Sequence, residues 1–248
     1  MNDTIATILK HRSIRRFSDQ PLADSQLKEY IRAGQMASSS SFIQAVSVIR
    51  VSDSANRAKF AKLAGGQPYV ESAPEFLVFC ADLSRNRDRI RRDVAAEEPD
   101  FSWTEQFIAA TVDVALFAQN VVVAAESDGL GCCYIGGIRN DPEQVTELLA
   151  LPDLVYPVFG LCLGYPDQDP AAKPRLPIEA VFHQNAYPER GETDVVLDEY
   201  DAEVADYYQR RTNGKLNVTF TQQMAKQSAS QTRKFMGEYI KKQGFNQH

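Results

Sequence analysis

The sequence predicts a soluble globular protein built from helices and strands. Four short apolar runs, at residues 46–51, 75–81, 131–137 and 155–163, have the length and composition of β-strands. Between the runs, apolar residues recur at helical spacing, most clearly over residues 104–127. The chain has 248 residues, of which 44% are hydrophobic and 24% charged, which suits one domain or two small ones.

Composition also excludes several classes of protein. The net charge of -6 argues against a nucleic-acid binder, because such proteins carry basic stripes. The first residues contain no apolar run of signal-peptide length, and charged and amide side chains interrupt the 104–127 stretch, so we expect a cytoplasmic protein with no membrane span. The four cysteines lack the spacing of a zinc site or a redox pair, which predicts buried, reduced thiols.

The first half of the chain predicts alternating helices and strands. Asn2 or Asp3 caps a short helix that runs through Leu9, and Asp24 caps a second helix that ends at the serines of residues 38–41. After the first strand, a helix over 54–63 ends at Gly65, Gly66 and Gln67. Residues 82–100 are rich in Arg, Asp and Glu, and we expect this stretch to be mobile and solvated on the surface.

The second half is organised around the long apolar helix predicted at 104–127. A helix that is apolar on most sides must be the spine of the core, the middle of a subunit interface, or both. The cap and proline at Asp141 and Pro142 begin another helix. Two further helices are predicted at 198–211 and 221–243, in a tail too polar to form its own core, and we expect this tail to wrap a partner subunit.

Residues 11–17 form a compact cationic cluster inside an acidic chain. The sequence His-Arg-Ser-Ile-Arg-Arg-Phe offers an imidazole, a hydroxyl and three guanidinium groups, which is the donor set of an anion site. The alternative is a solvated loop whose arginines pair with surface carboxylates. A second cationic stretch at 173–177 is either the other half of such a site or an exposed proline-rich loop.

Other motifs limit the possible chemistry. The serines at 38–41 are either hydrogen-bond donors in a tight place or a turn. Gly129 and Gly131 follow a helix and precede a strand, which is the reverse of the order in a dinucleotide-binding loop. We find no Ser/His/Asp set, no metal cluster and no paired carboxylates with persuasive spacing. A cofactor that carries the chemistry itself would require none of these.

Six blocks of sequence, taken together and in order, resemble the nitroreductase superfamily. More narrowly, they are similar to its oxygen-insensitive NADPH nitroreductase and NADPH-flavin oxidoreductase branch. The blocks span nearly the whole chain, and they are residues 11–15, 38–42, 65–67, 134–140, 159–166 and 173–177.

The resemblance implies an α+β sandwich with a central, mostly antiparallel sheet flanked by helices. It also implies a homodimer with FMN at the interface and NADPH as co-substrate. By this resemblance, residues 1–183 are the FMN-binding core, and residues 184–248 are an extension of the same structural domain that wraps the partner subunit. Hydride passes from NADPH to FMN and then, in a separate ping-pong step, to nitroaromatics, quinones or related acceptors.

Residue roles also follow from the resemblance. His11, Ser13, Lys173 and Arg175 match ligands of the FMN phosphate, and Arg12 lies along the ribityl chain. Arg15 is at the pyrimidine edge of the flavin and supports it electrostatically, and no residue acts as a catalytic acid or base. The remaining contacts are expected from the partner's Ser39, Ser40 and Ser41, from Gln67, from Tyr134, Ile135, Gly136 and Gly137, and, for NADPH, from Arg211 or its neighbour Arg210.

Three points stay open at this level. The acceptor could be free flavin, which would make the protein an NADPH-flavin reductase. A flavin-binding protein without turnover, or a small anion-binding module, is an alternative of a different class. Arg16 has no assigned partner in the site, and we expect it to be solvated.

Overall fold

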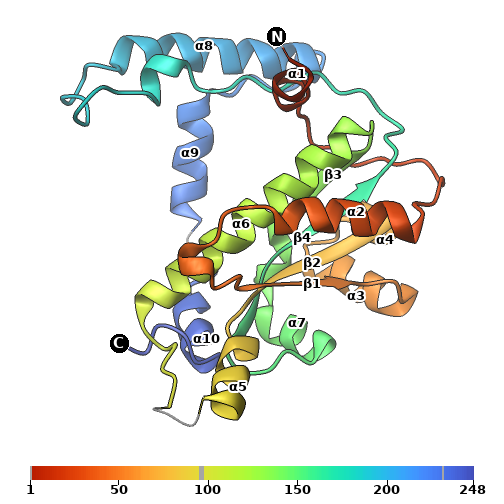
Figure 1. Ribbon diagram of the computed structural model, residues 1–248. Coiled ribbons are helices and arrows are strands. Elements are labelled where there is room, and N and C mark those ends of the chain that lie inside the picture. The colour runs from red at the N-terminus through yellow and green to blue at the C-terminus, as the bar shows by residue number, and fades with distance from the viewer. Residues whose placement is uncertain (1, 95–97, 231) are drawn as a thin grey trace. The chain divides into compact units, whose positions relative to one another are not determined.

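The structure is a computed structural model that describes residues 2–94, 98–230 and 232–248. The chain forms two compact units, the first made of residues up to 170 together with 235–248, and the second of residues 171–234 (Figure 1). The division predicted between residues 183 and 184 is a different one, and it stays a prediction.

The first unit is built on a four-stranded sheet whose neighbouring strands are all antiparallel. This confirms the predicted α+β class. The order across the sheet is β1, β2, β4, β3, and the strands are β1 (Val46–Arg50), β2 (Glu75–Asp82), β3 (Gly131–Ile135) and β4 (Val155–Gly164).

The two central strands are covered on both faces, which explains their continuous apolar sequences. Alternate residues of β2 enter different clusters: Leu77 and Phe79 pack into one, Phe76 and Val78 into the other. Helices α2 (Asp24–Gln35) and α6 (Thr104–Ser127) cover the first face. Helices α3 (Ser54–Leu63), α4 (Pro68–Ser72) and α7 (Pro142–Leu149) cover the second.

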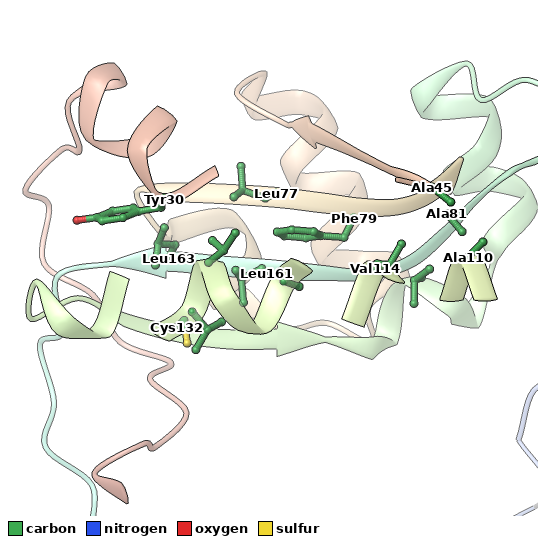
Figure 2. Packing of buried hydrophobic residues seen from close by; sticks show 14 of the residues in the cluster. Tyr30, Ala45, Leu77, Phe79, Ala81, Ala110, Val114, Cys132, Leu161 and Leu163 are labelled. Carbon is green, nitrogen blue, oxygen red and sulfur yellow. The ribbon is translucent and has the colours of Figure 1, made fainter. Parts of the chain in front are cut away.

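Helix α6 is the spine of the first cluster, as its sequence predicted. Ala110 and Val114 pack above the sheet residues Phe79 and Leu161, and all four are shielded from solvent (Figure 2). Gly34 of α2 lets the two helices approach closely, because a Cβ there would lie 2.4 Å from the Phe117 ring. By length and composition α6 could also cross a membrane, but core helices of soluble proteins meet the same criterion.

Local capping agrees with the sequence at two helices and differs at a third. The Asn2 side chain accepts from the backbone of Ile5 and begins α1 (Asp3–Leu9), and Asp141 does the same for α7. The prediction that Asp24 caps α2 is wrong, because Ala23 is the cap residue and Asp24 lies inside the helix. Asp24 instead pairs with Arg50 on β1 at 2.6 Å.

Part of the charged stretch at 82–100 is ordered, which corrects the expectation that it is mobile. Residues Ser84–Asp93 form helix α5. Its first turn is tied to the β1 region, since Arg85 donates to the Gln44 carbonyl at 2.9 Å and Asn86 to the Ile43 carbonyl at 2.9 Å. Residues 95–97 lie outside the described part of the chain.

The tail contains two helices where one was predicted over residues 221–243. Helix α9 (Phe220–Ala229) begins with a capping box at Thr219. It belongs to the second unit, with α8 (Asp194–Arg211) and a short 3-10 turn (Ile178–Ala180). Helix α10 (Met236–Lys242) belongs to the first unit. Tyr239 and Phe245 are buried in that unit's core, where Phe245 packs edge-on against Tyr156.

Candidate functional site

The cationic cluster of residues 11–17, called the cationic segment below, lies beside β3 and extends the edge of the sheet. Ser13 pairs with Cys132 in a parallel bridge, and the Ile14 amide donates to the Cys132 carbonyl at 2.8 Å. Ile14 is buried, and its side chain fills the space that a Cβ on Gly131 would need. Backbone pairing therefore fixes the middle of this segment against β3.

His11 is half-buried and is held from α6. Its Nδ1 lies 2.7 Å from Oε1 of Glu126, in the last turn of that helix. The Cys132 thiol donates to the same carboxylate oxygen at 3.6 Å. The three side chains therefore form a cluster whose possible metal-ligand atoms lie within 4.8 Å of one another. Nothing in the sequence spacing predicted this cluster.

The terminal nitrogens of Arg12 have protein partners, whereas its Nε is a buried donor without one in the described part of the chain. It forms an ion pair with Asp169 and donates to the Lys10 carbonyl at 3.1 Å. Its Nε is buried and has no acceptor within the described part of the chain. A buried N–H without a partner costs free energy, which suggests that a ligand completes this place. Arg12 also lines a cavity of about 260 Å³ with Lys10 and Glu126.

Arg16 is solvent-exposed, as expected, and it also has a protein partner that the sequence did not indicate. Its Nε donates to the Asp167 carbonyl at 2.6 Å and lies 2.8 Å from Oδ2 of the same residue. Both side chains are more than 60% exposed, so the pair contributes little to stability. It does fix the turn after β4 against the cationic segment, as does the bridge between Phe17 and Pro166.

Tyr69, which no sequence motif indicated, contacts both Arg15 and Gln67. The Arg15 guanidinium lies 6.0 Å from the centre of the Tyr69 ring, within cation–π range. The Tyr69 hydroxyl donates to Gln67 Oε1 at 2.9 Å. Burial raises the pKa of the Tyr69 phenol, and Arg15 opposes that rise. The phenol therefore stays protonated and keeps its role as donor.

The glycines after β3 lie against the turn that carries Gln67. Asn140 donates to the Leu63 carbonyl at 3.1 Å, which joins the 3-10 turn of Gly136–Asn140 to the end of α3. A Cβ on Gly137 would lie 2.5 Å from the Ala64 carbonyl oxygen. Close packing of two backbones therefore accounts for Gly137 without reference to a flavin. A Cβ on Gly136 would lie 3.3 Å from the nearest atom, which belongs to the Arg139 side chain.

Tyr134 and Ile135 differ in what they can offer a ligand. The Ile135 side chain is 1% exposed and belongs to the core, so only its backbone could contact a cofactor. The Tyr134 ring is half-buried and packs edge-on against Phe159, at 4.9 Å between ring centres. Burial raises the pKa of its phenol, so the ring stays neutral.

The serines at 39–41 lie in a different place, at a loop fixed by Asp113. This carboxylate is buried in α6 and accepts from the amides of Ser40 at 2.9 Å and Ala45 at 3.4 Å. Ser41 and Phe42 have φ angles of 47° and 58°, a strained conformation for residues with side chains. The loop borders a cavity of about 430 Å³, and Phe42 is 82% exposed beside it.

Within one chain the serines and His11 are well separated. Asp113 and Glu126, which hold them, are 13 residues apart on α6 (126 − 113), or about 20 Å along the helix axis. One chain therefore does not bring the predicted serine contacts to the cationic segment.

The other predicted site residues lie in the second unit. Lys173 and Arg175 are exposed in the proline-rich segment, with the Lys173 ammonium 5.3 Å from the centre of the Tyr208 ring. The Tyr200 hydroxyl anchors this segment by donating to the Pro174 carbonyl at 3.2 Å. Arg211 donates to the Tyr207 hydroxyl at 2.9 Å.

Arg210, beside it on α8, pairs with Asp206 at 2.8 Å.

An antiparallel sheet flanked by helices, with a cationic segment paired to its edge strand, is the fold that the sequence blocks implied. The chain belongs to the nitroreductase family. The model of that family matches residues 8–165, and the model of its C-terminal domain matches residues 173–248.

Individual relatives agree along the whole chain. FMN reductase (NADPH) of Bacillus subtilis is 44% identical over 251 residues, covering both chains completely. Oxygen-insensitive NADPH nitroreductase of Salmonella typhimurium is 43% identical and covers 99% of each chain. The solved structure of NADPH:FMN oxidoreductase from Vibrio harveyi, complexed with NAD+, has a TM-score of 0.88 and 44% identity, covering all of both chains.

Proposed function

We propose that this protein is an FMN-dependent NADPH oxidoreductase that reduces nitroaromatics, quinones or related acceptors. The observation that carries the proposal is the Arg15–Tyr69–Gln67 group beside the end of β3. It presents a cation and an oriented amide side by side, which is what the pyrimidine edge of a flavin requires. When bound, FMN supplies the hydride-transfer chemistry, and the protein supplies position and electrostatics.

Arg15 and Gln67 bind the flavin ring by different means. A guanidinium close to the ring favours negative charge there, and Tyr69 holds it in place from one side. Because Gln67 Oε1 already accepts from Tyr69, its amide nitrogen is the end that can donate to a flavin carbonyl oxygen. The backbone of Tyr134, Ile135, Gly136 and Gly137 borders the ring.

The tail of FMN lies along the cationic segment. Arg12 contacts the ribityl chain or the phosphate through its buried Nε, for which the protein offers no acceptor in its described part. His11 and Ser13 bind the phosphate, and the family resemblance adds Lys173 and Arg175 as further phosphate contacts. A phosphate monoester carries nearly two negative charges, and side-chain cations replace the glycine-rich helix N-terminus that other folds use.

Two copies of the chain form the active enzyme, and Ser39, Ser40 and Ser41 contact the flavin of the partner subunit. The separation of about 20 Å along α6 between the anchors of the serine loop and of His11 supports contact in trans. Three apolar side chains on one side of α6 support the dimer: Ile108, Val112 and Leu116 are each between 44% and 49% exposed. They recur every four residues and form a continuous stripe.

NADPH is the electron donor, and Arg211 or Arg210 contacts its 2′-phosphate. The cysteines support a reducing, cytoplasmic location, because all four are buried and unpaired. This bears out the sequence-based expectation of reduced thiols. Free flavin is a further acceptor, since relatives are named both as nitroreductases and as an FMN reductase.

The proposal is tested on the purified protein by absorbance and by steady-state turnover. We expect a yellow protein that releases FMN on denaturation and oxidises NADPH when a nitrofuran, a quinone or free FMN is supplied. A colourless protein that cannot be reconstituted with FMN would overturn the proposal. A yellow protein that oxidises neither NADPH nor NADH with any of these acceptors would instead be a flavin-binding protein without turnover.

A further inference from the structure

Glu126 occupies an unusual position for a carboxylate. It lies in the last turn of α6, where the partial negative charge of the helix end disfavours an anion. Its side chain is only 11% exposed, and Lys10 and Arg12 line the same cavity. A largely desolvated carboxylate in this place must be balanced by hydrogen bonds and positive charge.

Two donors provide that balance. His11 Nδ1 lies 2.7 Å from Glu126 Oε1, and the Cys132 thiol donates to the same oxygen at 3.6 Å. Burial, reinforced by the nearby Glu126 charge, raises the pKa of Cys132, so the thiol stays protonated and keeps donating. Glu126 Oε1 therefore accepts the bond from the thiol, and we place a hydrogen of the His11 ring on Nδ1, between the ring and the same oxygen.

The geometry argues for a hydrogen-bonded pair rather than a metal site. Nitrogen and oxygen ligands of a tetrahedral zinc, each at about 2.0–2.1 Å from the metal, lie about 3.3 Å from one another. The 2.7 Å between His11 and Glu126 is a hydrogen-bond length. A protonated, buried thiol is also a poor metal ligand.

We propose that Glu126 is a positioning residue that makes His11 selective for the phosphate of FMN. With Nδ1–H held by Glu126, only Nε2 of the imidazole is left for a ligand. In a neutral ring with this tautomer Nε2 is an acceptor and repels phosphate, whereas in the imidazolium both nitrogens donate. Nε2 therefore donates to a phosphate oxygen only in the doubly protonated ring, which then lies between the Glu126 carboxylate and the ligand dianion.

This inference rests on the proposed function, because it takes His11 as a phosphate contact. It adds a selectivity that the contact alone does not provide. The Glu126–His11 pair distinguishes FMN from riboflavin, which has the same ring and side chain without the phosphate. Any role of Glu126 in folding alone would affect both flavins equally.

The test measures dissociation constants of FMN and riboflavin for the apoprotein by quenching of flavin fluorescence. For Glu126→Gln we expect FMN affinity to fall roughly 10- to 100-fold, the scale of a lost charge-assisted contact, while riboflavin affinity changes less than about twofold. The matched control is Glu105→Gln, which removes the same charge from an exposed position in the first turn of α6.

Two results would overturn the inference: an equal loss for both flavins, or no loss for FMN. In a His11→Gln background, Glu126→Gln should cost nothing further, because the carboxylate acts through the imidazole. A full additional loss there would also contradict the proposal. If the wild-type apoprotein binds neither flavin, it is the proposed function that fails.

A measurement on the unmodified holoprotein avoids any folding defect of the variants. Nitrogen NMR of histidine-labelled protein distinguishes imidazolium from neutral imidazole, and the His11 signals are assigned from the spectrum of His11→Gln. We expect an imidazolium at pH 7.5 in the FMN-bound protein. A neutral His11 ring under these conditions would overturn the proposal.

Discussion

The Tyr69 hydroxyl donates to Gln67 Oε1 at 2.9 Å and so determines which end of the Gln67 amide is free. Oxygen and nitrogen of an amide are similar in size, and only their partners decide the orientation. With the oxygen occupied, the nitrogen is the end of the amide that could donate to a ligand carbonyl.

Replacing Tyr69 by Phe removes this constraint with little change in volume. We expect FMN affinity to fall about 5-fold, in line with roughly 1 kcal/mol for a neutral hydrogen bond, with the melting temperature nearly unchanged. Fluorescence titration of the apoprotein measures the affinity, and Tyr187→Phe, at a 91% exposed residue, is the control. Unchanged FMN affinity in Tyr69→Phe would remove Tyr69 from the site.

Gly137→Ala tests backbone packing at the end of β3. Its Cβ would lie 2.5 Å from the Ala64 carbonyl oxygen, so α3 or the 3-10 turn must move. We expect about 1–3 kcal/mol less free energy of unfolding in urea, the usual cost of overpacking. Gly237→Ala is the control, because nothing lies within 4 Å of its Cβ position in α10. Equal stabilities of the two variants would contradict this account.

The apolar stripe on α6 predicts the behaviour of a charged substitution. Val112, at the middle of the stripe, is 49% exposed in the single chain. If this stripe is the dimer interface, Val112→Asp buries a charge there, so we expect monomers by light scattering. If the proposed serine contacts come from the partner subunit, we also expect loss of bound FMN. The control is Val94→Asp, at an equally exposed residue after α5. A dimeric Val112→Asp would place the interface elsewhere.

The raised pKa of Tyr30 predicts that the stability of the folded protein falls at alkaline pH. Burial, and then the bond that its hydroxyl donates to Asp128 at 2.9 Å, raise its pKa to about 12. The folded state therefore holds this proton more tightly than the unfolded state, whose pKa is near 10. The resulting stability is present below pH 10 and is lost as the pH rises toward 12.

Urea unfolding at several values between pH 8 and pH 12 measures this effect. We expect Tyr30→Phe to be less stable than the wild type at pH 8, and the difference to shrink as the pH rises. Tyr156 and Tyr239, whose pKa values burial also raises to about 12, contribute equally to both proteins. A difference that stays constant with pH would contradict the account.

Separate substitutions of Arg211 and Arg210 test which of the two contacts NADPH. If Arg211 contacts the 2′-phosphate, Arg211→Ala raises KM for NADPH about 10-fold or more and leaves KM for NADH unchanged. Arg210, already paired with Asp206, serves as the control. The reverse pattern would assign the contact to Arg210, and equal effects on both nucleotides would exclude 2′-phosphate recognition.

The sequence predicted the two central strands well because they are covered on both faces. The continuous apolar run at Glu75–Asp82 needs no tertiary information, and the same holds for the bounds of α6. Helix α5 was missed because its composition is that of a solvated segment. Its order comes from Arg85 and Asn86, which bind carbonyls some 40 residues away in the chain.

The candidate site was predicted in part. Motif residues were found because basic and small side chains form compact blocks in the sequence. Tyr69, Glu126 and Asp113 were not, because Glu126 and Asp113 act on residues far away in the chain, and Tyr69 likewise contacts the distant Arg15. The only local signal was at Asp113 and Glu126, which are charged residues on the buried side of an otherwise apolar helix.

The first unit is discontinuous in sequence, because residues 235–248 return to it after 64 residues of the second (234 − 170). Phe245, with no exposed surface, lies against Tyr156 and Phe107 in its core. During synthesis the ribosome must therefore release residue 245 before this core can close. Until then the nascent chain exposes Phe107, Tyr156 and the α6 stripe, and we expect it to depend on chaperones at that stage.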